Sequence, residues 1–418
     1  MTAMGHVAIQ NEPTAASEGI VVPCEGEFHA RRKVAIFADP LLAPTHTFIP
    51  AQGNMLKRFE ACFAGPQLGR AEGLSLPAER TAVISSGRSL PGRLREVRFR
   101  LTGKSPGFFR RVERFSPVLV HAHFGPGATE AIELARWLRV PLIANFHGGD
   151  ATVEPEYLLR SRHSMHRKFW RRREELMREA SLILTCSDFV RRELIRKGFP
   201  EEKIRVHYIG IDTQFFTPDP AVRRERMVLY AGSLPESKGI LNLIRAMGEV
   251  QNRIPDARLV VLGDGPMREE AEREAARRLH GCQFLGFQRT KVVREWMNRA
   301  RAFCMPSQRA ADGWREGFGL VFIEAQAMEL PVASFASGGI PEAVEDGKTG
   351  LLCEAGDVNA LVRNLTFLLE DESYWKLMSR AARERVCERF DLRKRTEILE
   401  DIYDEVLGNA AAQVCIAG

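Results

Sequence analysis

The chain has 418 residues, of which 44% are hydrophobic and 27% are charged, and its formal net charge is +6. These fractions are typical of a soluble globular protein, and the length favours two domains over one. No segment approaches the ~20 consecutive apolar residues of a membrane-spanning helix. The eight cysteines include no C-x-x-C pair and no metal-ligand spacing, so reduced thiols and no bound metal are predicted.

Residues 1–30 mix charged and apolar residues, because Glu12, Glu18, Glu25 and Glu27 interrupt every apolar run. This pattern is not that of a secretory signal, and we expect a disordered leader. Residues 31–210 alternate short apolar runs with longer helical patterns, as expected for one Rossmann-like domain. Its predicted strands are Val34–Ala38, Val118–His121, Leu142–Phe146 and Leu182–Thr185.

The alternation starts again after a linker rich in turn residues, placed at about 210–222. Residues 222–395 form the second predicted Rossmann-like domain, and 396–418 a C-terminal helix and tail whose small residues should fray beyond Leu407. The predicted fold class is α/β, with two parallel sheets whose strand C-termini face a common cleft. The predicted strands are Val228–Ala231, Arg258–Gly263, Cys282–Leu285, Ala302–Met305 and Pro331–Ser334, with helices at Ile240–Val250 and Met267–Leu279.

Basic residues gather in two stretches of the first half. Residues 88–114 contain nine Lys or Arg against two Glu, and 167–173 add five more around Phe169 and Trp170. A solvated face is the plain interpretation. The alternative is attraction to a phosphorylated acceptor or an anionic membrane, worth about 1 kcal/mol per basic residue near such a surface. No nucleic-acid-binding motif accompanies the charge, so nucleic acid is not an expected partner.

The strongest chemical signal is the run Glu316-Gly317-Phe318-Gly319-Leu320-Val321-Phe322-Ile323-Glu324. A helix that begins near Gly319 presents unpaired amide groups at its first turn, which suits a diphosphate. Glu324 lies about one turn inside this apolar helix, where a carboxylate is costly unless it is paired. Ribose hydroxyls or an arginine elsewhere in the chain would both satisfy it, and the residues alone do not choose between them.

A second loop, Gly232-Ser233-Leu234-Pro235-Glu236-Ser237-Lys238-Gly239, follows the first strand of the second half. Gly232 permits close approach of a ligand to the backbone. Lys238 can stabilise the charge of a departing diphosphate. A solvent-exposed lysine at a helix start is the alternative, but lysine is disfavoured at a helix N-terminus unless an anion is present.

These segments resemble the retaining glycosyltransferases of family 4, which include exopolysaccharide and phosphatidylinositol mannosyltransferases of GT-B architecture. The resemblance is dense from about 180 to 355 and weaker before. Its further matches are Val261–Pro266, Phe284–Gly286, Ser337–Glu342, Gly347 and Gly350–Leu352, and in the first half Thr45–Ile49, Val120–Gly125 and Phe146–Asp150.

The resemblance implies that residues 31–210 form the acceptor-side domain, and it implies a role for each site residue. Glu316 and His147 would hold the donor sugar, and Glu324 the ribose. The leaving diphosphate would be stabilised by Lys238 and by the amides of Gly319, Leu320 and Val321. The nucleotide base would lie near Gly286 and Phe287. The nucleotide site would be lined by Gly232, Ser233 and Gly263.

Two residues depart from the family pattern. Ser233 stands where most members carry an arginine that contacts the diphosphate, so one contact worth roughly 1.5–3 kcal/mol is lost or supplied from elsewhere. His46 replaces a glutamate of the exopolysaccharide branch. The chain also contains no D-x-D sequence, so we expect transfer that requires neither a metal nor another cofactor.

The expected function is hexosyl transfer from a UDP- or GDP-sugar to a saccharide or lipid-linked saccharide, in the cytoplasm or on the inner face of the membrane. An epimerase or phosphorylase of the same fold, or a non-catalytic sugar-nucleotide-binding subunit, remains an alternative. A dehydrogenase is disfavoured, because no G-x-G-x-x-G follows the first strand of either half.

Overall fold

The computed structural model describes residues 31–43, 46–69, 75–85 and 89–417. The predicted leader 1–30 and Thr45 therefore lie outside the described residues. Every element named below belongs to the unit formed by residues 32–418.

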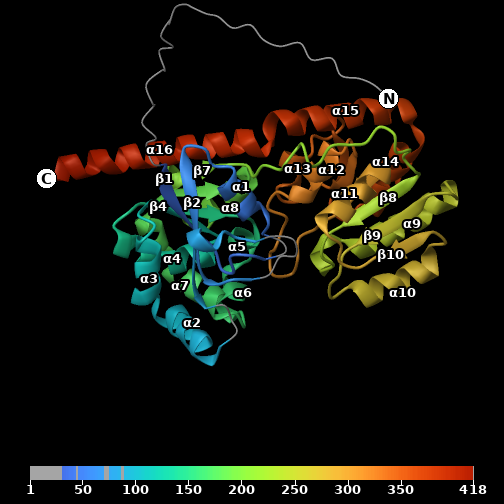
Figure 1. Ribbon diagram of the computed structural model, residues 1–418. Helices are drawn as coiled ribbons and strands as arrows, with labels where there is room; N and C mark the ends of the chain where they lie inside the picture. The colour runs from blue at the N-terminus through green and yellow to red at the C-terminus, as the bar shows by residue number, and fades with distance from the viewer. Residues whose placement is uncertain (1–30, 44–45, 70–74, 86–88, 418) are drawn as a thin grey trace, which may run out of the picture. The chain divides into compact units, whose positions relative to one another are not determined.

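The first sheet has seven parallel strands within the described residues, in the order β3-β2-β1-β4-β5-β6-β7. In chain order they are β1 (Arg32–Phe37), β2 (Phe59–Gln67), β3 (Thr81–Ser85), β4 (Pro117–His123), β5 (Leu142–Phe146), β6 (Ala180–Thr185) and β7 (Ile204–Val206). The helices of this half are α1 (Phe48–Asn54), α2 (Leu90–Thr102), α3 (Pro106–Glu113), α4 (Gly125–Leu138), α5 (Gly149–Thr152), α6 (Pro155–Arg160), α7 (Ser164–Glu179) and α8 (Asp188–Arg196), with 3-10 turns η1 (Ala78–Arg80) and η2 (Glu201–Lys203) (Figure 1).

The second sheet has six parallel strands in the same described part, in the order β10-β9-β8-β11-β12-β13. These are β8 (Met227–Ala231), β9 (Arg258–Leu262), β10 (Cys282–Phe284), β11 (Ala302–Cys304), β12 (Val332–Phe335) and β13 (Gly350–Cys353). Its helices are the 3-10 turn η3 (Glu236–Lys238), α9 (Ile240–Arg253), α10 (Arg268–Arg278), α11 (Thr290–Arg299), α12 (Leu320–Ala327), α13 (Ile340–Ala343), α14 (Val358–Glu370) and α15 (Glu372–Arg389).

The predicted α/β class with two parallel sheets is confirmed. Every strand predicted from an apolar run is present within two residues of its expected ends, and β5 has the predicted bounds. Four further strands, β2, β3, β7 and β13, were not predicted. Gly65 and Pro66 interrupt β2, Gly350 opens β13, and β7 has only three residues, so these strands give weak periodic signals.

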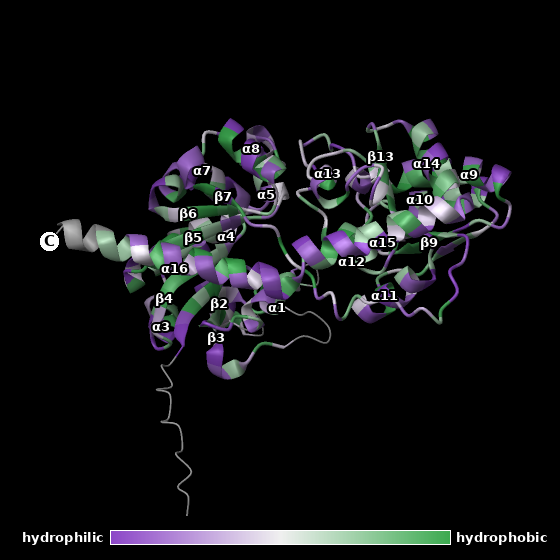
Figure 2. Cartoon of the chain, turned by 90° about the horizontal axis from the view of Figure 1, so that it is seen from above, coloured by the Kyte–Doolittle hydropathy of each residue, from purple (hydrophilic) through white to green (hydrophobic). Residues whose placement is uncertain are grey.

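The long helix α16 (Leu392–Ala417) returns from the second half to cover one face of the first sheet (Figure 1). Alternate residues of β1 show this layering: Val34 and Ile36 pack in one cluster with Tyr403 of α16, whereas Ala35 and Phe37 face the core on the other side. Hydrophilic and hydrophobic residues alternate along α16, as this half-buried position requires (Figure 2).

The C-terminal helix ends later than expected, because α16 continues beyond Leu407 to Ala417. Asn409 is followed by three alanines, and alanine has the highest intrinsic helix propensity. The small residues thus extend the helix. Among the described residues, no helix is both long and apolar enough to cross a membrane.

Candidate active site

Three loops at the C-terminal edge of the second sheet interlock through their backbones. Gly232 donates its amide to the Leu262 carbonyl at 2.9 Å, and Gly263 donates to the Gly286 carbonyl at 2.8 Å. A Cβ atom at Gly263 would collide with the Gly232 carbonyl oxygen. The predicted glycines after β8, β9 and β10 therefore lie together, where a side chain would separate the loops.

Lys238 and Glu316 form an ion pair between the loops that follow β8 and β11. Both side chains are largely buried, at 15% and 10% exposure, and the Lys238 ammonium also lies 5.0 Å from the centre of the Trp314 ring. Strands β8 and β11 are adjacent, and the strand order runs outward in opposite directions from this point. Such a switch point is where open parallel sheets bind ligands.

The helix predicted near Gly319 is α12, which begins at Leu320 with Gly319 at its N-cap. Glu324 lies one turn inside it and is partly buried. In the described part of the chain, its carboxylate has no hydrogen-bond or ion-pair partner, and burial raises its pKa to about 7. The arginine alternative is thus not realised by any described residue.

The loop that carries Glu316 is fixed by contacts with both halves of the chain. Gly339 donates its amide to the Glu316 carbonyl at 2.8 Å, and the Ser187 hydroxyl donates to the Gly317 carbonyl at 2.5 Å. Ser187 precedes α8 of the first half and is fully buried. The backbone position of Glu316 therefore depends on residues far apart in the sequence.

His147 follows β5 and lies against this loop, because a Cβ atom at Gly317 would be 2.5 Å from the His147 carbonyl oxygen. Its Nε2 lies 3.0 Å from Nδ1 of His123, and Phe48 and Phe124 surround the ring. Burial, with the neighbouring His46 and His121, holds the pKa of His147 well below its ordinary value. His147 is therefore a neutral imidazole at physiological pH.

Asp150 is a positioning residue that sequence reasoning passed over, although it stands in the quoted Phe146–Asp150 segment. Its carboxylate accepts the amides of His147 at 3.1 Å, Gly148 at 2.8 Å and Gly125 at 3.0 Å. These bonds join the loop after β5 to the start of α4. Burial raises the pKa of Asp150, and the three amides oppose that rise.

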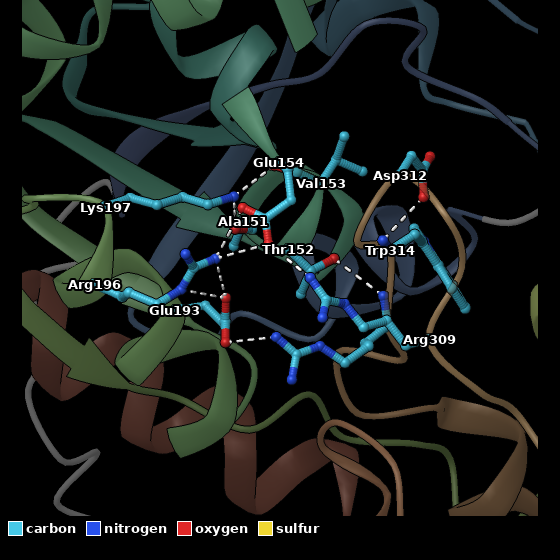
Figure 3. A network of polar contacts seen from close by, with 11 residues as sticks. Ala151, Thr152, Val153, Glu154, Glu193, Arg196, Lys197, Arg309, Asp312 and Trp314 are labelled. Atoms are coloured by element: carbon cyan, nitrogen blue, oxygen red, sulfur yellow. Dashed lines mark hydrogen bonds and ion pairs between the residues drawn. The ribbon is translucent and has the colours of Figure 1, made fainter. Parts of the chain in front are cut away.

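Charged side chains also connect the two halves beside the site (Figure 3). Arg315 pairs with Glu193 at 2.7 Å, and Arg309 pairs with Glu154 at 3.1 Å. The Glu154 amide donates to the Asp312 carbonyl at 2.8 Å. Loop 307–315, just before the Glu316 motif, is thus attached to the first half.

Two predicted site residues are more exposed than the rest. Ser233 is exposed, and its carbonyl accepts the Tyr230 hydroxyl at 2.7 Å. Phe287 is 63% exposed beside Gly286. Next to Gly286 lies a cation that sequence reasoning missed, since a Cβ atom at Gly286 would be 3.1 Å from the Arg268 guanidinium. Arg268 lies on α10 and gave no signal among the other charges of that helix.

Comparison with known proteins agrees with this arrangement. Residues 63–215 match the family model Glycosyltransferase Family 4, and residues 213–385 match Glycosyl transferases group 1. The chain is 30% identical over 307 residues to the sulfoquinovosyl transferase SQD2 of Arabidopsis thaliana, covering 70% of this chain and 57% of that protein. It is 30% identical over 279 residues to the putative colanic acid biosynthesis glycosyltransferase WcaL of Escherichia coli, covering 63% of this chain and 65% of that protein.

The match thus spans less than two thirds of the length of either relative. Among solved structures, Anabaena Alr3699/HepE in complex with UDP and glucose superposes with a TM-score of 0.69 at 19% identity, covering 90% of this chain and all of that one.

Two parallel sheets, a returning C-terminal helix and a charged pair at the switch point of the second sheet give this chain the GT-B architecture. The two matched regions together span residues 63–385. The chain thus contains a Glycosyltransferase Family 4 region followed by a Glycosyl transferases group 1 region.

Proposed function

We propose that this enzyme transfers a hexosyl group from a UDP- or GDP-sugar to a saccharide or lipid-linked saccharide, with retention at the anomeric carbon and without a metal. The observation that carries the proposal is the Lys238–Glu316 ion pair at the C-terminal ends of β8 and β11. In this proposal, Lys238 stabilises a departing diphosphate and the adjacent Glu316 holds sugar hydroxyls.

The chemistry requires one bond to form and one to break at the anomeric carbon. The acceptor hydroxyl oxygen attacks from the face of the leaving group while the bond to the diphosphate oxygen breaks. The hydroxyl proton passes to the departing phosphate oxygen, so no protein base is needed. Lys238 and the first amides of α12, at Leu320 and Val321, stabilise the negative charge that develops on that oxygen.

The remaining site residues divide the donor between them. Glu324 accepts hydrogen bonds from the ribose hydroxyls, which supply the partners that its carboxylate lacks among the described residues. The base lies against Gly286 and the exposed Phe287. Arg268, beside Gly286, is the candidate for the cation missing at Ser233.

His147 contacts the sugar as a neutral hydrogen-bonding group, as the burial of its ring implies. The name of WcaL supports a saccharide acceptor, since that relative is a putative glycosyltransferase of colanic acid biosynthesis, and the name of SQD2 supports transfer of a sugar group, sulfoquinovosyl. We place the reaction in the cytoplasm, at the inner face of the cell membrane.

The test begins with thermal shifts of the purified chain with UDP, GDP and ADP. A nucleotide at about a hundred times its dissociation constant should stabilise the protein by about 2.7 kcal/mol. The nucleotide sugar of the best binder is then assayed for nucleotide release with saccharide acceptors. We expect Glu316→Gln to lower release at least about 100-fold, whereas the control Glu354→Gln, on the exposed surface, keeps it. Full activity of Glu316→Gln would refute the assignment.

The alternatives make different predictions in the same assay. An epimerase would release nucleotide without an acceptor, and a phosphorylase would require inorganic phosphate. A non-catalytic subunit would bind nucleotide and release none under any condition. Acceptor-dependent release separates the transferase from all three.

A further inference from the structure

Helix α2 presents an apolar stripe to solvent. Leu90, Leu94, Val97 and Leu101 are 71%, 62%, 52% and 75% exposed. Their spacing of four, three and four residues places them on one face of the helix. Isolated exposed apolar residues are ordinary, but a continuous stripe of four along one helix marks an interaction surface.

The opposite face of α2 is fixed to the protein, so the stripe is not a core face turned outward. Gly92, Glu96 and Phe99 are buried, and Phe99 packs edge-on against Phe108 of α3 at 6.0 Å. The Ser89 hydroxyl accepts the Gly92 amide at 3.2 Å and caps the helix start. The helix is therefore ordered while its apolar stripe remains outside.

Cations flank the stripe. Arg95 and Arg98 of α2 are exposed, and neither forms an ion pair with another described residue. Burial lowers the pKa of Arg111 on α3, and the positive charges of Arg95 and Arg114 lower it further. Glu113 is the acidic residue exposed among them.

A helix with exposed leucines on one face and arginines beside them matches the interface of an anionic bilayer. The apolar side chains enter the boundary between headgroups and acyl chains, and the guanidinium groups contact lipid phosphates. The second basic stretch is a weaker candidate. Within it, Arg172 pairs with Glu175 at 2.6 Å, and Lys168 donates to the Arg100 carbonyl at 2.7 Å.

We infer that α2 docks the first half of this enzyme on an anionic membrane surface, through Leu90, Leu94, Val97 and Leu101 together with Arg95 and Arg98. This inference names the surface that would contact the membrane, and its functional role rests on the membrane location proposed above. Binding itself is measured without donor or acceptor, so it can fail or succeed independently of the proposed reaction.

The test is flotation of the full chain with vesicles of phosphatidylcholine alone or mixed with phosphatidylglycerol. We expect binding to the mixed vesicles only, and less at high salt because the charges are screened. The double substitution Leu94→Ser with Leu101→Ser should reduce the bound fraction at least about ten-fold. Arg95→Gln with Arg98→Gln should weaken binding and its dependence on salt.

Matched controls change exposed residues of the same types elsewhere. Leu377→Ser with Ile398→Ser removes apolar groups that are 66% and 41% exposed on α15 and α16, and Arg273→Gln with Arg277→Gln removes exposed cations of α10. Both controls should float like the unmodified chain. The thermal shift with the best-binding nucleotide should be unchanged in every variant, which verifies folding and an intact donor site.

Two results would overturn the inference. The first is that the unmodified chain does not float with the anionic vesicles, or that the leucine variant floats equally well. The second is that the chain is a dimer by light scattering, becomes a monomer in the leucine variant, and binds no vesicles. The stripe would then be a contact between two copies of the chain.

Discussion

At the scale of single residues, the site depends on carboxylates whose environments differ. Glu316 is paired with Lys238, Glu324 has no partner among the described residues, and Asp150 accepts three backbone amides. The first contacts an ammonium group, the second lacks a donor, and the third fixes the backbone around His147. Each difference leads to its own prediction.

Glu324 should make stability depend on pH. Its pKa is about 7 when folded, against roughly 4.3 in an unfolded chain. Between these values the folded protein holds a proton that the unfolded chain has released, so the free energy of unfolding falls as pH rises through this window. Glu324→Gln should match the unmodified protein at about pH 4 and exceed its stability by on the order of 2 kcal/mol at about pH 8.

Urea unfolding at both pH values measures that difference, and nucleotide titration of the same protein should show weaker binding. Equal unfolding free energies of the two proteins at the higher pH would mean that burial does not raise the pKa of Glu324.

Asp150→Ala should leave the amides of Gly125, His147 and Gly148 without their acceptor. We expect a loss of about 3 kcal/mol of unfolding free energy, together with slower nucleotide release because His147 is no longer fixed. Urea unfolding and the release assay measure the two effects. Asp256→Ala is the control, since the Asp256 side chain is 65% exposed. If Asp150→Ala were as stable and as active as the control, the three hydrogen bonds of Asp150 would have no positioning role.

At the scale of elements, one buried carboxylate of α16 binds the backbone at the start of β2. Glu400 is 1% exposed and accepts the amides of Lys57 at 2.8 Å, Arg58 at 2.7 Å and Phe59 at 3.0 Å. These residues lead into β2 at the edge where the strand begins. The helix therefore satisfies backbone donors that the sheet leaves unpaired.

Glu400→Ala should lower the free energy of unfolding by about 3 kcal/mol, because three backbone amides lose their acceptor. Glu397→Ala, one turn earlier, removes a 55% exposed partner of Lys57 and should cost at most about 0.5 kcal/mol. Equilibrium denaturation of both variants makes the comparison, and similar losses would contradict the assigned role of Glu400.

The elements also show which parts of the fold and of the site the sequence predicts. The run Met227–Ala231 is entirely buried and apolar, so its continuous apolar composition predicts β8, and the glycines after it locate the loops of the site. The sequence does not predict strand β2, because its pairing with neighbouring strands, and not its composition, makes it a strand. The sequence also does not identify the role of Asp150, because one of its partners, Gly125, is 25 residues away. Only the adjacency of strands β4 and β5 brings Asp150 and Gly125 together.

At the scale of the whole molecule, the two halves meet through polar contacts beside the site. Arg315 of the second half pairs with Glu193 and lies 4.8 Å from the centre of the Phe189 ring. The Glu154 amide is bonded to the Asp312 carbonyl in the same region. These contacts hold His147 and Glu316 in one site.

Arg315→Ala should loosen this attachment while each half stays folded. We expect the Glu154 amide to exchange its hydrogen at least about ten-fold faster, since local opening becomes easier. Hydrogen exchange followed by mass spectrometry measures this. Arg192→Ala is the control, because Arg192 is 64% exposed and pairs within α8. Unchanged exchange at Glu154 would show that the Arg315 pair does not hold the halves together.

The contact of Gly148 with Gly317 has a consequence for how such enzymes diverge. A Cβ atom at Gly148 would be 3.1 Å from Cα of Gly317, and one at Gly317 would be 2.7 Å from Cα of Gly148. Backbone contacts backbone at this junction, so no pair of side chains has to match there between the two halves. Exchange of one first half for another would preserve this junction, whereas the Arg315–Glu193 and Arg309–Glu154 pairs would be kept only if both partners were kept.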